Sequence, residues 1–164
     1  MKSALMIIDL QNAYCTSENK DSMYSACTTI NKAIDLFRRS NQPIIWVQHI
    51  NEDDGSVPGN PGFNYIEPLK PNINDYYVYK RYRNSFNKTN CLDIIRKEQI
   101  DTVIISGFSA AYCIHGTIIG ALDNDLKPLL LINGIASDFS EHIKVVEQTN
   151  QVISLNELGE LMNR

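Results

Sequence analysis

Three residues whose side chains could perform covalent chemistry lie far apart in the sequence: Asp9, Lys80 and Cys113. Asp9 and Lys80 each end a run of apolar or aromatic residues typical of a buried strand. Cys113 lies about one turn inside a helix that follows a third such run. In a parallel sheet the carboxyl ends of the strands lie at one edge, where open α/β folds bind ligands. We therefore expect the three side chains to meet in one site.

A thiol, an ammonium and a carboxylate together are suited to cleaving an acyl bond. The thiolate attacks the acyl carbon, the cation lowers the thiol pKa, and the carboxylate passes the proton to the leaving amine. The N–H groups of the helix that carries Cys113 should favour the thiolate and stabilise an oxyanion. The alternatives are packing for Cys113, since free cysteines are often buried, and a turn role for Asp9.

Hydrophobic periodicity places the elements that would position these residues. Strands are expected at 3–10, 43–49, 76–79, 103–105, 127–132 and 151–153, and helices at 22–39, 92–98, 140–149 and 156–162, with one more helix around Cys113. Ser106-Gly107 and Asn133-Gly134 are expected to be turns that end their strands. Strands alternating with helices predict a three-layer α/β/α fold, with a doubly wound, mainly parallel sheet of about six strands.

Composition narrows the class of protein. A chain of 164 residues is expected to form one domain over 1–164, and 43% hydrophobic with 21% charged residues is ordinary for a globular protein. A formal net charge of −4 argues against a nucleic-acid partner. No apolar run is long enough to cross a membrane, and Met1-Lys2-Ser3 leads into a strand rather than a signal peptide. The four cysteines lack C-x-x-C spacing, so we expect reduced thiols and a cytoplasmic location.

Three motifs in order carry a family resemblance: Ile8-Asp9-Leu10-Gln11-Asn12, then Lys80 with Ser85-Phe86, then the stretch from Gly107 to Cys113. Over nearly the whole chain this resembles the isochorismatase-like cysteine hydrolase superfamily. The resemblance implies hydrolysis of the C–N bond of a small amide or carbamoyl substrate through an acyl-enzyme, without a cofactor. Cys113 would be the nucleophile, Asp9 the general base and acid, and Lys80 the group that lowers the thiol pKa. A homo-oligomer, dimer or tetramer, is also implied.

The resemblance extends to the groups around the nucleophile. It implies a cis peptide bond between Phe108 and Ser109, and an oxyanion hole formed by the backbone N–H groups of Ser109 and Cys113. Residues near the triad are candidates for the wall of the substrate pocket: Gln11, His49, Tyr82, Phe86, Phe108 and Tyr112.

The sequence departs from the metal-binding members of this superfamily. Nicotinamidases bind a metal through an Asp and two His after the second strand, but here Val47 stands at the Asp position and only His49 matches a His. One imidazole does not make a metal site, so we expect no metal and place His49 in the pocket wall. Isochorismatases that act on a vinyl ether lack the cysteine, so Cys113 favours amide cleavage. The alternative is a degenerate member that binds a small ligand or senses oxidants through Cys113.

Overall fold

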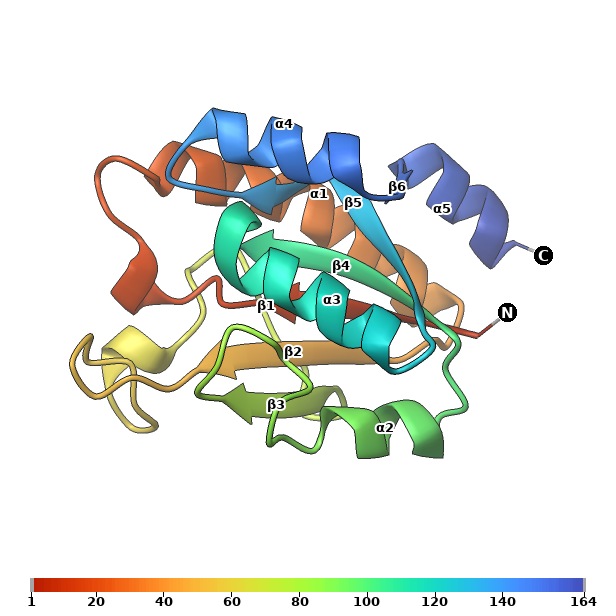
Figure 1. Cartoon of the computed structure of the whole chain (residues 1–164), viewed down its shortest axis with the longest axis horizontal. Coiled ribbons are helices and arrows are strands. Elements are labelled where there is room, and N and C mark those ends of the chain that lie inside the picture. Colours follow the sequence, from red (N-terminus) through yellow and green to blue (C-terminus); the bar gives the residue numbers. More distant parts are fainter. Residues whose placement is uncertain (1, 164) are drawn as a thin grey trace.

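The computed structural model describes residues 2–163, which form one sheet of six parallel strands in the order β3-β2-β1-β4-β5-β6 (Figure 1). The strands are β1 (Ser3–Ile8), β2 (Ile44–His49), β3 (Tyr76–Lys80), β4 (Thr102–Phe108), β5 (Lys127–Ala136) and β6 (Val152–Ile153). The α-helices are α1 (Lys20–Arg39), α2 (Cys91–Lys97), α3 (His115–Asp123), α4 (Ser140–Thr149) and α5 (Leu155–Met162). Three short helical turns complete the chain: η1 (Asn12–Tyr14), η2 (Pro61–Phe63) and η3 (Ala110–Ile114).

Both faces of the sheet are covered by helices. Met6 and Ile8 of β1 pack in the core that includes α2, α3 and α4, whereas Leu5 and Ile7 pack in the core that includes α1 and α5. Figure 1 shows α3 in front of the sheet and α1 behind it. Because a strand between two helical layers is buried on both faces, its sequence is a continuous apolar run rather than an alternating one. The three-layer α/β/α prediction is confirmed.

Helix α1 illustrates how the hydrophobic pattern sets the packing. Its buried side chains recur at intervals of three and four residues, as in Met23, Cys27, Ile30, Ile34 and Phe37. That spacing forms one apolar stripe on a helix, which here covers β1, β4 and β5. The helix ends before Pro43, whose carbonyl accepts a hydrogen bond from the Leu5 N–H and so starts the β1–β2 pairing. Cys27 is part of this core.

The predicted turn at Ser106-Gly107 is wrong, because β4 continues through it to Phe108. Gly107 has a φ of +119°, a conformation that side chains rarely adopt, and a Cβ there would lie 2.1 Å from the carbonyl oxygen of Ile8. The glycine therefore allows β4 to approach β1 closely rather than ending the strand.

The predicted turn at Asn133-Gly134 is also wrong, because these residues form a bulge inside β5. Leu130 pairs with Ile105 and Ile135 pairs with Gly107, so five residue steps of β5 lie against two of β4. Asn133 takes a positive φ of 62° within the bulge. Bulges and turns use the same residue types, which is why the sequence alone does not separate them.

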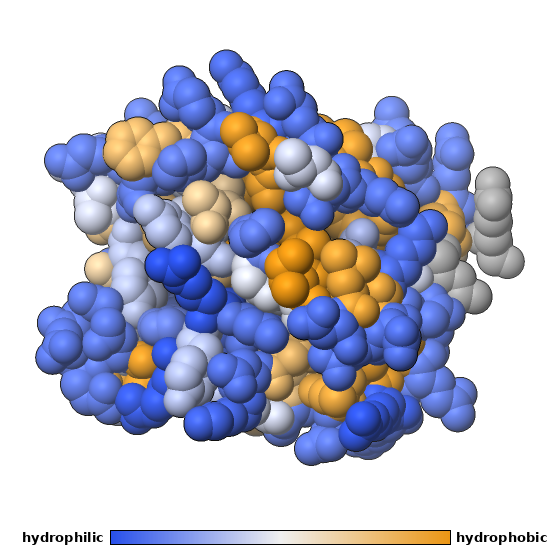
Figure 2. All heavy atoms as spheres, viewed as in Figure 1, coloured by the Kyte–Doolittle hydropathy of each residue, from blue (hydrophilic) through white to orange (hydrophobic). Residues whose placement is uncertain are grey.

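The surface over α3 combines apolar and charged side chains. Ile119 and Leu122 of this helix are exposed, and Figure 2 shows an apolar patch over α3 bordered by hydrophilic residues. Within residues 2–163, no helix has the length and apolar character that a membrane span requires.

Candidate active site

Asp9, Lys80 and Cys113 meet at the carboxyl edge of the sheet. Asp9 directly follows β1, Lys80 is the last residue of β3, and Cys113 lies in η3 after β4. The Lys80 Nζ donates to Asp9 Oδ2 at 2.7 Å and to Cys113 Sγ at 3.3 Å. Lys80 and Asp9 are both almost fully buried, with side chains 0% and 3% exposed. A buried ammonium is stable only when its hydrogens are accepted, and the carboxylate supplies the compensating charge.

The third hydrogen of the Lys80 ammonium fixes the protonation state and the tautomer of His49, the last residue of β2. Lys80 Nζ lies 2.8 Å from His49 Nδ1. Because an ammonium only donates, this ring nitrogen must accept, and the proton of the neutral imidazole sits on Nε2. Three N–H groups thus meet three acceptors: a carboxylate oxygen, a ring nitrogen and the sulfur.

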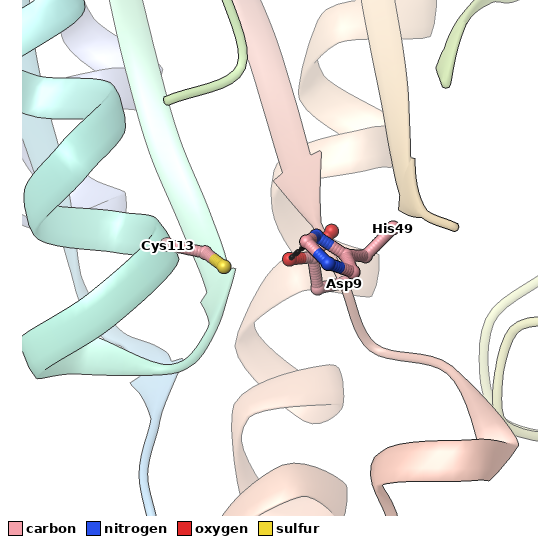
Figure 3. Close-up of side chains that lie close together, drawn as sticks. All are labelled: Asp9, His49 and Cys113. Atoms are coloured by element: carbon pink, nitrogen blue, oxygen red, sulfur yellow. Dashed lines mark ion pairs between the residues drawn. The ribbon is translucent and has the colours of Figure 1, made fainter. Parts of the chain in front are cut away.

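His49 is held in its neutral form. Burial lowers its pKa, and the adjacent Lys80 ammonium lowers it further. The contact of 4.0 Å between His49 Nδ1 and Asp9 Oδ2, dashed in Figure 3, is therefore not an ion pair at neutral pH. Figure 3 shows the thiol of Cys113 directed across a gap toward the Asp9 carboxylate and the His49 ring. His49 lines the same cavity as Cys113.

The thiol of Cys113 corrects one expectation from the sequence. Its pKa is raised to about 12, first by burial and then by the Asp9 carboxylate, and Lys80 opposes both without overcoming them. We therefore expect a neutral thiol at pH 7, not the thiolate that its place near a helix start suggested. A neutral thiol beside a carboxylate is a nucleophile whose proton leaves during attack rather than before it.

The thiol opens into a cavity of about 170 Å³. The peptide bond between Phe108 and Ser109 is cis, and the chain then enters η3, a five-residue π-helical turn continuous with α3. Such turns are frequent at functional sites. The cavity is lined by Asp9, Tyr14, His49, Asp54, Phe108, Ser109, Tyr112, Cys113 and Asp138.

Three residues expected in the pocket wall lie elsewhere. Gln11 is fully buried and donates from Nε2 to the oxygens of His49, Ser56 and Phe63 while it accepts from the His49 N–H, so it anchors the loop after β2. Phe86 packs in the core beneath α3, and Tyr82 is exposed with Lys88 against its ring. Neither of these aromatic residues is among the described residues that line the cavity.

Tyr14, Asp54 and Asp138 line the cavity without having been singled out from the sequence. Tyr14 belongs to η1 and its ring lies edge-on to His49, with centroids 6.1 Å apart. Asp54 lies in the long loop after β2, and Asp138 follows β5. The only sequence signal for these cavity residues was a polar side chain soon after the end of a strand. Many residues in such positions are ordinary turn residues.

A larger hollow of about 340 Å³ lies at the opposite, amino-terminal end of β2 and β3. Its described lining includes Arg38, Asp75 and Glu98, and Arg38 is already paired with Asp75 at 3.1 Å. The described lining of this hollow contains no cysteine, serine or threonine, whereas the smaller cavity at the carboxyl edge is lined by Cys113.

The profile of the Isochorismatase domain matches residues 3–154, nearly the whole chain. The chain belongs to the isochorismatase family. Over 119 residues it is 29% identical to an isochorismatase family protein of Bacillus subtilis, YrdC. The aligned segment covers 71% of this chain and 64% of that protein's length. It is 23% identical over 87 residues to the maleamate amidohydrolase of Pseudomonas putida, which covers 53% of this chain and 41% of that enzyme. Both matched segments span less than two thirds of the relatives' own length.

Solved structures of the family share the fold over its full extent. An isochorismatase-like hydrolase from Alkaliphilus metalliredigens superposes with a TM-score of 0.87 at 22% identity, covering 98% of this chain and 99% of that one. The N-carbamoylsarcosine amidase of Thermoplasma acidophilum gives a TM-score of 0.82 at 25% identity, covering 96% and 98%.

Three side chains of the site, a carboxylate, an imidazole and a thiol, are of types that coordinate metal ions. The ligand atoms of Asp9, His49 and Cys113 all lie within 4.8 Å of one another. Lys80 Nζ, however, lies 2.7 Å from Asp9 Oδ2, 2.8 Å from His49 Nδ1 and 3.3 Å from Cys113 Sγ. The ammonium thus already occupies the point at which these three would hold a cation, and two positive charges cannot share it. The residues present do not fit a metal centre.

Proposed function

We propose that this protein is a metal-independent cysteine amidohydrolase that cleaves the C–N bond of a small amide or carbamoyl compound. The observation that carries the proposal is the single ammonium of Lys80, 2.7 Å from Asp9 Oδ2 and 3.3 Å from Cys113 Sγ, beside a cavity that the cysteine lines. Maleamate amidohydrolase and N-carbamoylsarcosine amidase, two of its relatives, are amidases by name.

In the proposed first step, Cys113 Sγ attacks the carbonyl carbon while its proton passes to the Asp9 carboxylate. The carbonyl π electrons move to oxygen, and the oxyanion accepts hydrogen bonds from the backbone N–H groups of Ser109 and Cys113, both of which border the cavity. Lys80 keeps the Asp9 carboxylate oriented and holds positive charge beside the sulfur as negative charge develops on it.

In the second step, the intermediate collapses, the C–N bond breaks, and Asp9 returns its proton to the leaving nitrogen. The acyl group remains on Cys113 as a thioester. Asp9 then deprotonates a water that attacks this thioester, and the thiol leaves with the proton, which restores the resting state. The raised thiol pKa means that the nucleophile is generated only when Asp9 and substrate are both in place.

A panel of small primary amides and carbamoyl compounds, assayed for ammonia release, tests the proposal. Cys113→Ala and Asp9→Asn should each lower kcat by at least about a hundredfold. Cys15→Ser removes a thiol outside the cavity lining and serves as the matched control. Rapid quenching followed by intact-protein mass spectrometry should show the acyl-enzyme on the wild type and not on Cys113→Ala. Turnover that survives Cys113→Ala would contradict the assignment of Cys113 as the nucleophile.

Oxidant sensing through Cys113, the alternative, is less well supported. Oxidation by peroxide proceeds through the thiolate, and burial raises the pKa of this thiol to about 12. A homo-oligomeric state stays a prediction from the family, and light scattering of the purified protein measures it directly.

A further inference from the structure

The cavity beside Cys113 has an acidic wall. In addition to Asp9, the carboxylates of Asp54 and Asp138 line it, and its described lining contains no lysine or arginine. Asp54 Oδ2 accepts a hydrogen bond from Asn51 Nδ2, and Asp138 Oδ1 accepts one from Asn19 Nδ2 at 2.9 Å. These partners are neutral amides, so they orient the two carboxylates without cancelling their charge.

The basic residues near the cavity do not neutralise this wall. Lys80 is committed to Asp9, and Arg81 forms two hydrogen bonds of 2.9 Å with Glu52 on the surface. Arg83 stacks on the ring of Tyr112, 4.8 Å from its centroid, and is not among the lining residues. With the thiol and His49 neutral, three carboxylates and one ammonium leave the cavity with a net charge of −2. A concave site lined by one sign of charge concentrates ligands of the other sign.

Two buried polar atoms in the same wall have no partner among the described residues. Asp9 is 2% exposed, and its Oδ1 accepts no hydrogen bond. The hydroxyl of Tyr14 is buried too: burial raises its pKa to about 12 against the opposing effect of Ser56, and no described group is in hydrogen-bond geometry with it. Buried polar atoms are rarely left unpaired, so both atoms are available to pair with a ligand group, and the carboxylate oxygen accepts from an N–H or O–H.

We infer that the site selects small amides that carry no negative charge and that bear a cationic or N–H-rich group, which Asp54 and Asp138 bind. This inference rests on the proposed function and specifies its substrate class. The reactive carbonyl lies against Cys113, and the far end of the substrate lies between the two aspartates. Carboxylate-bearing amides are excluded because their charge would face a wall of like charge without a basic partner.

Charge selection at Cys113 is testable without knowing the substrate. Three methanethiosulfonates of similar size carry trimethylammonium, hydroxyl and sulfonate groups, whose charges do not change with pH. Their rates of modifying Cys113 in a Cys15→Ser background are followed by mass spectrometry, and each is divided by its rate with 2-mercaptoethanol. We expect the cationic reagent to react at least about tenfold faster than the anionic one, with the neutral reagent between them.

The variants Asp54→Asn and Asp138→Asn should each reduce this cation-to-anion ratio, and the double variant should bring it close to one. Asp53→Asn is the matched control, because it removes the same charge from a neighbouring exposed residue that does not line the cavity. A ratio near or below one in the parent protein, or a ratio that Asp53→Asn changes as much as Asp54→Asn does, overturns the inference.

A parallel hydrolysis assay compares β-alaninamide, propionamide and malonamate, which are cationic, neutral and anionic amides of similar length. Preferential turnover of the cationic amide, lost in the double variant, supports the inference. Turnover of malonamate at an equal or higher kcat/KM overturns it while leaving the amidohydrolase proposal intact. Charge selection in thiol modification without hydrolysis of any amide contradicts the proposed function and supports charge selection by the cavity.

Discussion

The buried ion pair between Lys80 and Asp9 makes the sharpest prediction for stability. Lys80→Met keeps most of the side-chain length but removes the ammonium, which leaves the Asp9 carboxylate buried at 3% exposure without its 2.7 Å partner. Breaking a buried pair from one side costs about 3–5 kcal/mol, a large part of the 5–15 kcal/mol that stabilises a typical domain. We therefore expect the free energy of unfolding to fall by about this amount.

Urea unfolding followed by tryptophan fluorescence measures this effect, because the lone tryptophan, Trp46, is fully buried in β2. A double-mutant cycle with Asp9→Asn should show strong coupling, since the double variant no longer leaves an unpaired buried charge. Arg81→Met is the control: its pair with Glu52 has similar 2.9 Å contacts, but both side chains are more than half exposed. We expect no measurable loss there. A cost below about 1 kcal/mol for Lys80→Met, or a cycle without coupling, would refute the reasoning.

Three further predictions follow from backbone contacts, thiol burial and loop anchoring. Gly107→Ala should abolish soluble folded protein, because its Cβ would lie 2.1 Å from the Ile8 carbonyl oxygen, whereas Gly159→Ala in α5 meets nothing within 4 Å and should raise stability in urea by about 0.5–1 kcal/mol. Alkylation of Cys113 by iodoacetamide should accelerate about tenfold per pH unit from pH 7 to pH 10, because its pKa of about 12 keeps the thiolate fraction rising throughout; a plateau below pH 9 contradicts the burial argument. Gln11→Leu removes three donated hydrogen bonds to the loop after β2 and should speed its cleavage in limited proteolysis, with global unfolding in urea as the control measurement.

The elements that position Asp9 and Lys80 could be predicted because local patterns specify them. The apolar run of β1 leads directly to Asp9, and the aromatic run of β3 ends at Lys80. Parallel order then brings distant strand ends to one edge, which is why residues separated by 71 positions bond to each other. The parallel strand order alone therefore predicts that these strand ends lie close together, without any information on side-chain contacts.

The rest of the site depends on contacts that no local pattern encodes. Gln11 was expected to face the pocket, but Asp9 takes a positive φ of 54°, and Gln11 lies buried beyond it. Asp54 and Asp138 reach the cavity through the paths of loops, which long-range packing decides. The prediction of a lowered thiol pKa failed for a related reason. The sequence identifies the charged neighbours of Cys113, but burial, the largest cause of the shift, exists only in the folded chain.

The bulge at Asn133-Gly134 gives β5 a segment whose length can change without moving the cavity. Its extra residues are absorbed before Ile135 resumes pairing with Gly107, so the core register is held while the chain beyond it delivers Asp138 to the cavity rim. Because the bulge already holds residues that do not pair with β4, adding or deleting one residue inside it should leave Ile135 paired with Gly107 and the same side chains at the rim. We therefore expect β5 to tolerate changes of bulge length that leave both cores and Asp138 in place.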